Sequence, residues 1–248
     1  MQDNLRPLIL SIETATRAGS LAITRGESVL AARQGDASIS HSTNLLEQIR
    51  GALDEVALEL HEVDALAVAS GPGSFTGLRI GLATVKSFAA TLEKPCVGIP
   101  TLQAVARAAG ESTCTIALLP AGRGEVYAQK FSVGADGIVA PLEPPIHIAP
   151  EMLLKQTRAR RCLKWAGEGA HIYLEAIKFS AHAEGIDFRV QGSDDLSAED
   201  GWTVVEASEF LAATVGRLAT MFAPFENGSS PQDLHAIYVR PSDAELNA

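Results

Sequence analysis

The sequence is poor in cysteine and in long hydrophobic runs. Its three cysteines, Cys96, Cys114 and Cys162, lie far apart, and no Cys-x-x-Cys pair occurs among 248 residues. This pattern excludes a zinc knuckle and a disulfide framework, and it is typical of a reducing compartment. The apolar stretch near the amino terminus, Leu8–Ile12, is too short for a signal peptide or a membrane span. We therefore expect a cytoplasmic protein.

Positive charge is also scarce. The chain has 20 Lys and Arg against 30 Asp and Glu, which gives a net charge of −10. This balance argues against strong unaided binding to nucleic acid, because such binding needs several cations to neutralise phosphates. The short basic cluster between Arg158 and Lys164 is interpreted as a solvated helix face. The length and the hydrophobic content of 46% allow one large core or two modest ones.

Several catalytic motifs are missing. No two of the six histidines stand four residues apart, so the sequence contains no helical zinc pair. A Walker A loop is excluded because Gly81 precedes Lys86-Ser87 without the second glycine. A nucleophile elbow is excluded because Ser74 has Pro72 and Thr76, not glycines, two residues away on either side.

The most informative segment is Ser70–Gly81, with the sequence Ser-Gly-Pro-Gly-Ser-Phe-Thr-Gly-Leu-Arg-Ile-Gly. An apolar strand over 65–69 leads into the turn at 71–73. Ser74 is then expected to cap a helix that runs from Phe75 to about Leu92. Such a unit either binds an anion at its free backbone N–H groups or lets another backbone pack closely.

The packing alternative follows from the period of the helix. Gly77 and Gly81 lie on one helical face, and Thr84 continues the row. An apolar stripe lies beside it, formed by Leu78, Leu82, Val85, Ala89 and Leu92. A face of small residues next to a face of large ones suits a helix that is packed on two sides. We expect its own sheet on one side and a helix of a partner on the other.

The order of predicted elements indicates a duplicated α/β fold. The first series has strands over 8–13, 20–24 and 27–32, a helix over 41–60, a strand over 65–69, a helix over 75–92, a strand over 96–99 and a helix over 101–109. The second has strands over 115–119, 126–133 and 137–139 with a hairpin turn at 133–137, a proline-rich loop over 141–150, a helix over 151–157 and a strand over 162–166.

We place the boundary so that residues 1–104 form an N-terminal lobe that binds a partner and residues 105–248 form a C-terminal lobe. A terminal helix is predicted over 207–221, as a candidate to pack back on the first lobe. The stretch 179–200 has little periodicity and gives no clear element.

A phosphoryl-transfer site is predicted to be incomplete. Glu13 ends the first strand, where nucleotide-dependent enzymes often hold a metal-binding acid. Ala15, however, stands where a phosphate-binding hairpin usually has a glycine. No second acid follows the later strand at Leu119-Pro-Ala-Gly-Arg123, and Glu125 is the nearest candidate. We assign no catalytic and no metal-binding residue.

Segments spread over nearly the whole chain resemble the TsaB (YeaZ) family. They are Leu10-Ser-Ile-Glu-Thr-Ala-Thr16, His41-Ser42 with Leu45-Leu46, Gly71–Gly81, Gly124-Glu-Val-Tyr127 and Tyr238-Val-Arg240. The resemblance implies an α/β, two-lobed actin/hexokinase-like (ASKHA) fold of duplicated ribonuclease-H-like units. It further implies a non-catalytic relative of TsaD that serves in making N6-threonylcarbamoyladenosine in tRNAs reading codons that start with A. One departure is Pro120-Ala121, where the family commonly has an Asp-Ala pair.

The resemblance also implies partners and site residues. The expected partners are TsaD, TsaE and a second copy of the chain, with tRNA bound only through the complex and no membrane. The expected interface consists of His41, Leu45, Leu46, Ile49, Phe75, Thr76, Gly77, Arg79, Gly81 and Thr84. No intrinsic cofactor is expected, but ATP or ADP is a candidate at the surface shared with TsaD. The residues proposed to lie near such a nucleotide are Glu13, Thr14, Gly71, Gly73 and Ser74.

Three other functions stay open from the sequence. The first is an autonomous ATPase or kinase of the actin-like superfamily, with Glu13 holding magnesium. The second is a glycoprotease-like peptidase, which the absent histidine pair and elbow serine disfavour. The third is a plain tRNA-binding module, which the acidic charge disfavours.

Overall fold

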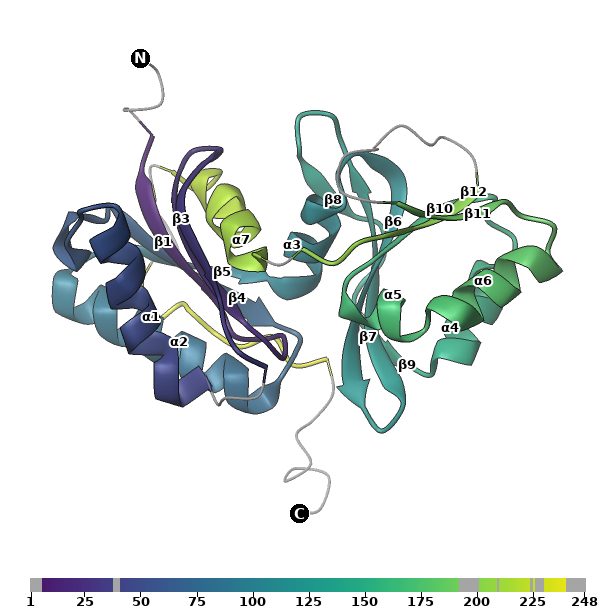
Figure 1. The fold of residues 1–248 in the computed structure, drawn as a ribbon, viewed down its shortest axis with the longest axis horizontal. Coiled ribbons are helices and arrows are strands. Elements are labelled where there is room, and N and C mark those ends of the chain that lie inside the picture. Colours follow the sequence, from purple (N-terminus) through teal and green to yellow (C-terminus); the bar gives the residue numbers. More distant parts are fainter. Residues whose placement is uncertain are drawn as a thin grey trace. The chain divides into compact units, whose positions relative to one another are not determined.

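The computed structural model describes residues 6–37, 41–191, 201–208, 210–223, 225 and 230–239. The chain divides into two compact units (Figure 1). Unit 1 consists of Met1–Ala104 and Glu209–Tyr238, and unit 2 consists of Val105–Ser208 and Val239–Ala248.

Unit 1 is built on a five-stranded sheet in the order β3-β2-β1-β4-β5. Its strands are β1 (Leu8–Glu13), β2 (Ser20–Arg25), β3 (Ser28–Gln34), β4 (Ala65–Gly71) and β5 (Cys96–Pro100). The first three pair antiparallel, whereas β4 and β5 continue the sheet in parallel from β1. Every residue of β1 and β4 is buried, which explains why these strands read as continuous apolar runs.

Helices cover both faces of this sheet. The helices α1 (His41–Glu55) and α2 (Phe75–Leu92) lie on one face and α7 (Leu211–Thr220) on the other (Figure 1). Polar contacts hold α7 in place, since Ser11 Oγ donates to the carbonyl of Ala212 at 2.7 Å. Gly216 lets α7 approach β2 closely, because a Cβ there would lie 2.5 Å from Thr24 Oγ1.

Unit 2 repeats this topology on a second sheet, in the order β11-β12-β10-β6-β7-β8 with β9 paired to β7. Its strands are β6 (Ser112–Gly122), β7 (Glu125–Val133), β8 (Val139–Pro141), β9 (Ile146–Ile148), β10 (Cys162–Ala166), β11 (Phe188–Gln191) and β12 (Gly201–Val205). As in unit 1, three antiparallel strands are followed by parallel ones. The predicted duplication of an α/β unit is therefore confirmed.

The helices of unit 2 are α4 (Pro150–Thr157), α5 (Glu168–Ile172) and α6 (Leu174–Ala183), while α3 (Thr101–Ala108) crosses the boundary between the units. Trp165 and Trp202 lie on neighbouring strands and are fully buried, with ring centroids 5.2 Å apart. These large side chains form the centre of the hydrophobic core of unit 2.

Some predicted elements differ from the observed ones. The helix predicted over 41–60 ends at Glu55, because Ala57 has a positive φ of 53° and the chain turns there before a short 3-10 helix, Leu60–Glu62. The predicted loop over 141–150 contains β9, which pairs antiparallel with β7. The stretch 179–200 holds the end of α6 and all of β11, and its residues 192–200 lie outside the described ones.

The second unit is not the continuous segment 105–248. Residues 209–238 belong to unit 1, since α7 packs on β1 and β2. The helix expected over 207–221 thus returns to the first sheet, with bounds Leu211–Thr220. Among the described residues, no helix is long and apolar enough to cross a membrane.

Candidate functional site

The glycine-rich segment forms the expected strand, turn and helix start in unit 1. The pairing of β4 with β5 shifts between Ala69 and Gly71, so the strand is bulged where the turn begins. Gly71 has a φ of +112°, a conformation that glycine adopts easily and that other residues rarely adopt. Ser74 caps α2, since its Oγ accepts a hydrogen bond from Gly77 N at 3.2 Å.

Two backbone N–H groups of this turn donate hydrogen bonds to other residues of the chain. Gly71 N donates to Thr101 Oγ1 at 3.0 Å, and Ser74 N donates to the carbonyl of Ala15 at 2.8 Å. A Cβ on Gly73 would lie 2.5 Å from that same carbonyl oxygen. The turn is therefore fastened to the β1–β2 hairpin, which favours the packing alternative over anion binding.

Gly77 and Gly81 face residues of their own unit. A Cβ on Gly77 would lie 1.9 Å from the carbonyl oxygen of Thr14, and one on Gly81 would lie 2.4 Å from Thr14 Oγ1. Both glycines are buried against Thr14, the residue that follows β1, and Gly81 also lies against Val68 of β4. We correct the interface prediction for these two residues, because their small size serves the packing of α2 on its own sheet.

The first strand ends at Glu13, whose buried carboxylate accepts hydrogen bonds from the hairpin that follows. Glu13 is 1% exposed, and its two carboxylate oxygens accept hydrogen bonds from Thr16 N and Thr16 Oγ1, each at 2.7 Å. These bonds stabilise the bend between β1 and β2, in the place where the sequence suggested a metal-binding acid. Within the described residues, no three His, Cys, Asp or Glu side chains form a group that could hold a metal ion.

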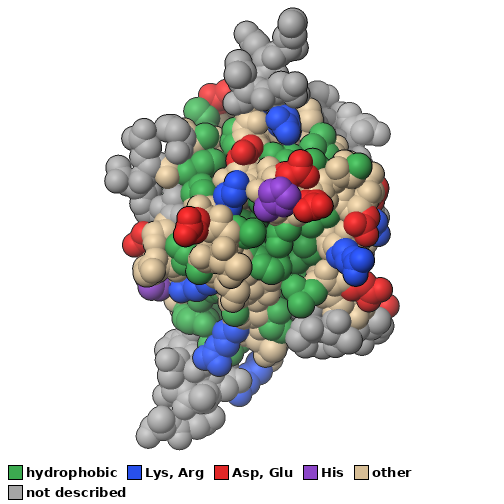
Figure 2. All heavy atoms as spheres, turned by 90° about the vertical axis from the view of Figure 1, so that its left-hand side faces the viewer, with side chains coloured by type: hydrophobic (Ala, Val, Ile, Leu, Met, Phe, Trp, Pro, Cys, Tyr) green, Lys and Arg blue, Asp and Glu red, His purple; other side chains and the backbone are tan. Residues whose placement is uncertain are grey.

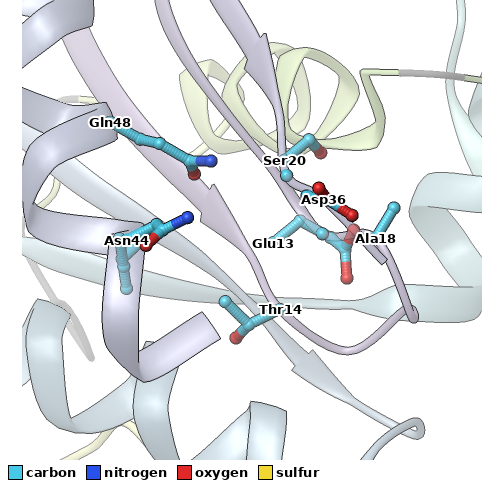
Figure 3. A pocket seen from close by; sticks show the side chains of 10 residues that line it. Glu13, Thr14, Ala18, Ser20, Asp36, Asn44 and Gln48 are labelled. Atoms are coloured by element: carbon cyan, nitrogen blue, oxygen red, sulfur yellow. The ribbon is translucent and has the colours of Figure 1, made fainter. Parts of the chain in front are cut away.

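A small polar pocket lies between this hairpin and the first turns of α1 (Figure 3). It is lined by Glu13, Thr14, Ala18, Gly19, Ser20, Gly35, Asp36, Asn44, Leu45 and Gln48. The side chains of Asn44 and Gln48 reach from one wall towards the hairpin on the other (Figure 3). Its empty volume of about 310 Å³ includes open solvent, and no Lys or Arg is among its lining residues.

The predicted interface residues on α1 divide into buried and exposed ones. Leu45 and Ile49 are buried in unit 1, so their prediction as interface residues is corrected to core residues. Leu46 is 64% exposed and remains available at the surface. His41 begins α1, but its side chain lies outside the described part of the structure.

On α2 the exposed face differs from the glycine row that the sequence suggested. Thr76 and Arg79 are exposed, whereas Phe75 and Thr84 are half-buried. The sequence reasoning missed three small exposed residues, namely Ala83, Ser87 and Ala90. They recur every three or four residues, so the same periodicity that located the buried stripe could have identified them.

The face that carries α1 and α2 is shown in Figure 2. Hydrophobic side chains occupy much of its centre, with acidic and basic side chains around them (Figure 2). An exposed apolar area with a charged rim is typical of a surface that binds another protein.

In unit 2, the hairpin between β6 and β7 carries no acid at Pro120-Ala121. Its tip runs through Gly122, Arg123 and Gly124, which all have positive φ. Glu125 is half-exposed and has its Oε2 2.9 Å from His147 Nε2 on β9. It therefore lies in a surface cluster of β7 and β9.

Two of the three thiols, those of Cys96 and Cys114, are buried. Burial raises the pKa of Cys96 and of Cys114, and the guanidinium of Arg160 and the ammonium of Lys130 only partly offset this effect at Cys114. Both thiols therefore stay protonated near neutral pH, and a protonated thiol is a poor nucleophile.

Comparison with known proteins identifies the family. The family model TsaD, described as tRNA N6-adenosine threonylcarbamoyltransferase, matches residues 33–194. The tRNA threonylcarbamoyladenosine biosynthesis protein TsaB of Escherichia coli K12 is 32% identical over 153 residues, which are 58% of this chain and 64% of that protein. TsaB of Haemophilus influenzae is 36% identical over 127 residues, which are 48% of this chain and 51% of that protein. The chain thus spans less than two-thirds of either relative.

The fold comparison agrees. A crystal structure from Pseudomonas aeruginosa, described as similar to the peptidase YeaZ, superposes with a TM-score of 0.72 at 23% identity. The match covers 94% of this chain and all of the other one. At that identity it shows the fold alone, which is the expected actin/hexokinase-like α/β fold. Because the family model covers more than half of the sequence and relatives named TsaB match it, the chain belongs to the TsaD family and, within it, to the TsaB (YeaZ) group.

Proposed function

We propose that this protein is an accessory subunit in the synthesis of N6-threonylcarbamoyladenosine in tRNAs that read codons starting with A. It has no catalytic activity of its own. It binds the transferase TsaD through α1 and α2 of unit 1 and holds that enzyme in an active arrangement. The ATPase TsaE joins the assembly, and tRNA is bound only through the complex.

The observation that carries this proposal is the family match. The model that matches residues 33–194 is that of the transferase, while matching relatives from three bacteria carry the name of the biosynthesis protein TsaB. A chain that shares the fold of an enzyme and is related to a differently named protein of the same pathway fits the role of an accessory subunit.

The geometry of unit 1 supports the same role. The carboxylate of Glu13 accepts hydrogen bonds from Thr16. The turn at Gly71 and Ser74 donates hydrogen bonds to α3 and to the β1–β2 hairpin. These features stabilise the scaffold. The exposed parts of α1 and α2, in contrast, offer Leu46 and a row of small residues with Arg79 at its start. Small exposed residues on a helix allow a second helix to approach closely.

The nucleotide is proposed to lie at the surface shared with TsaD. The pocket beside Glu13 and Thr14 also contains Asp36 and has no Lys or Arg in its lining. Two carboxylates repel a phosphate chain unless a cation neutralises them. We therefore propose that ATP or ADP, where the assembly uses it, is held mainly by groups of the partner.

Reconstitution of the modification tests the function. Purified TsaD, TsaE, threonylcarbamoyl-adenylate, ATP and tRNA are mixed with and without this protein, and the modified nucleoside is measured. We expect modification only when this protein is present. Equal modification in both samples would show that the proposed role is wrong.

The interface is tested with a pair of matched substitutions on exposed helical alanines. Ala83→Arg places a long charged side chain in the middle of the exposed face of α2, whereas Ala176→Arg does the same on α6 of unit 2. We expect Ala83→Arg to weaken binding to TsaD and self-association, both measured by sedimentation, and Ala176→Arg to leave them unchanged. Equal binding by both variants would exclude this face.

The rival function of an autonomous ATPase is tested on the isolated protein. Its ATP turnover is measured with magnesium, alongside that of Glu13→Gln. We expect no turnover by either protein. Turnover that Glu13→Gln abolishes would instead assign catalysis to Glu13.

A further inference from the structure

The segment Leu234–Tyr238, called the strap here, crosses unit 1 at the carboxyl ends of β4 and β5. It forms no helix or strand, yet Leu234 is only 4% exposed. It follows α7 along the chain and appears in yellow in Figure 1, close to the start of α2. Its last residue, Tyr238, belongs to a sequence motif that the sites described above leave without a role.

The strap is bound where β4 is irregular. The pairing of β4 with β5 skips Ser70, since Ala69 pairs with Ile99 and Gly71 with Pro100. The carbonyl of Ser70 accepts a hydrogen bond from Ile237 N at 2.7 Å. The bulge in β4 therefore presents a backbone acceptor to the strap.

Two glycines give the strap room. A Cβ on Gly71 would lie 2.6 Å from the carbonyl oxygen of Ile237, and one on Gly98 would lie 2.9 Å from Leu234 Cδ1. Contacts this short are not tolerated without a shift of the neighbouring atoms. The backbone of the strap thus lies where a side chain at Gly71 would have to be, whereas at Gly98 only the end of the Leu234 side chain would have to move.

The end of the strap contacts the first turn of α2. The ring of Tyr238 lies 5.1 Å from the ring of Phe75, at an interplanar angle of 36°. The guanidinium carbon of Arg79 lies 3.9 Å from the centre of the Phe75 ring. Phe75 thus contacts both Tyr238 and Arg79, and the three side chains form one cluster, called the stack below. Tyr238 is 49% exposed, so it contributes to this stack more than to the core.

We propose that the strap is a positioning device, in which Tyr238 fixes Phe75 and Arg79 at the start of α2 in the geometry that binds the partner. The functional part of this proposal rests on the proposed function, because Arg79 belongs to the face that contacts TsaD. Tyr238 is a positioning residue, since it acts through Phe75. The hydrogen bond from Ile237 N to the carbonyl of Ser70 holds the strap, and with it Tyr238, in place.

The first test measures hydrogen exchange of the backbone amides at residues 71–79 in the protein alone. Tyr238→Ala is expected to accelerate this exchange roughly tenfold, the change that the loss of one aromatic pair would give. Tyr238→Phe keeps the ring and is expected to exchange like the parent protein. Phe179→Ala is the control, because Phe179 is a more exposed aromatic residue on α6 of unit 2. Unchanged exchange in Tyr238→Ala would overturn the proposal.

The second test measures binding of the same folded variants to TsaD. Tyr238→Ala is expected to bind roughly tenfold more weakly, and Tyr238→Phe to bind normally. Faster exchange with unchanged binding would show that the strap only stabilises the fold, and would overturn its positioning role. If the parent protein itself does not bind TsaD, the proposed function fails, while the exchange experiment still decides whether the strap fixes the start of α2.

Discussion

Thr14 and Gly77 are joined across the junction between β1 and α2. Thr14 Oγ1 donates a hydrogen bond to the carbonyl of Gly77 at 2.8 Å, and a Cβ on Gly77 would lie 1.9 Å from the carbonyl oxygen of Thr14. The helix therefore approaches the end of the strand so closely that only a hydrogen atom fits between them. This contact fixes the glycine-rich turn to the hairpin that follows Glu13.

Gly77→Ala is expected to destabilise the protein by about 3 kcal/mol, because the added methyl group overlaps a buried backbone oxygen. The measurement is the free energy of unfolding in urea. Gly51→Ala is the matched control on α1, where the nearest atom to a Cβ is Arg33 Cζ at 3.4 Å. There the substitution is expected to leave stability unchanged or raise it by up to about 1 kcal/mol, since alanine favours helix. Equal stability of both variants would contradict the close approach.

Thr14→Val is expected to lower stability by about 1–2 kcal/mol, because it keeps the shape of the side chain but leaves the buried carbonyl of Gly77 without this donor. Thr14→Ser keeps the hydroxyl and removes only a methyl group. We expect the serine variant to retain the hydrogen bond and to lose less stability than the valine variant. The free energy of unfolding in urea, measured for both variants and the parent protein, tests this. A larger loss in the serine variant would show that packing, not the hydrogen bond, dominates at this position.

The sequence predicts the order of elements well, because buried strands such as β4 are continuous apolar runs and Ser74 is a strong helix cap. It does not predict which face of a glycine-containing helix is open. Gly77 is compatible with a partner helix or with its own strand, and only the distance to Thr14 decides. The position of the strap cannot be predicted from the sequence either, since no residue near Leu234 indicates that it packs against Gly98. Such contacts join residues far apart in the sequence.

Leu45 and Leu46 are adjacent on α1 but lie in different environments, 6% and 64% exposed. Leu45→Ala is expected to cost about 3 kcal/mol of stability, because it leaves a cavity in the core of unit 1. Leu46→Ala is expected to cost less than about 0.5 kcal/mol, as exposed substitutions usually do. If the proposed interface is correct, Leu46→Ala weakens binding to TsaD although stability is unchanged. Loss of stability in Leu46→Ala would mean that this side chain is buried.

The sequence predicts Lys164 on a solvated helix face, but it is a buried cation on strand β10. Its ammonium donates to the carbonyls of Ala109 and Glu111, at 3.3 and 2.7 Å. Burial lowers its pKa, and the carboxylate of Glu111 only partly offsets this effect. Between the lowered pKa of the folded state and the ordinary pKa of lysine, the unfolded chain binds more protons than the folded one. Stability from this group therefore rises with pH across that window.

Lys164→Met removes the titrating group and keeps much of its volume. The difference in unfolding free energy between the parent protein and this variant is expected to grow in favour of the parent as the pH rises towards about 10, near the ordinary pKa of lysine. Urea titrations of both proteins at a series of alkaline pH values measure this difference, in which the shared titration of other groups cancels. A difference that stays constant, or falls with rising pH, would mean that the ammonium is better solvated in the folded protein than its burial indicates.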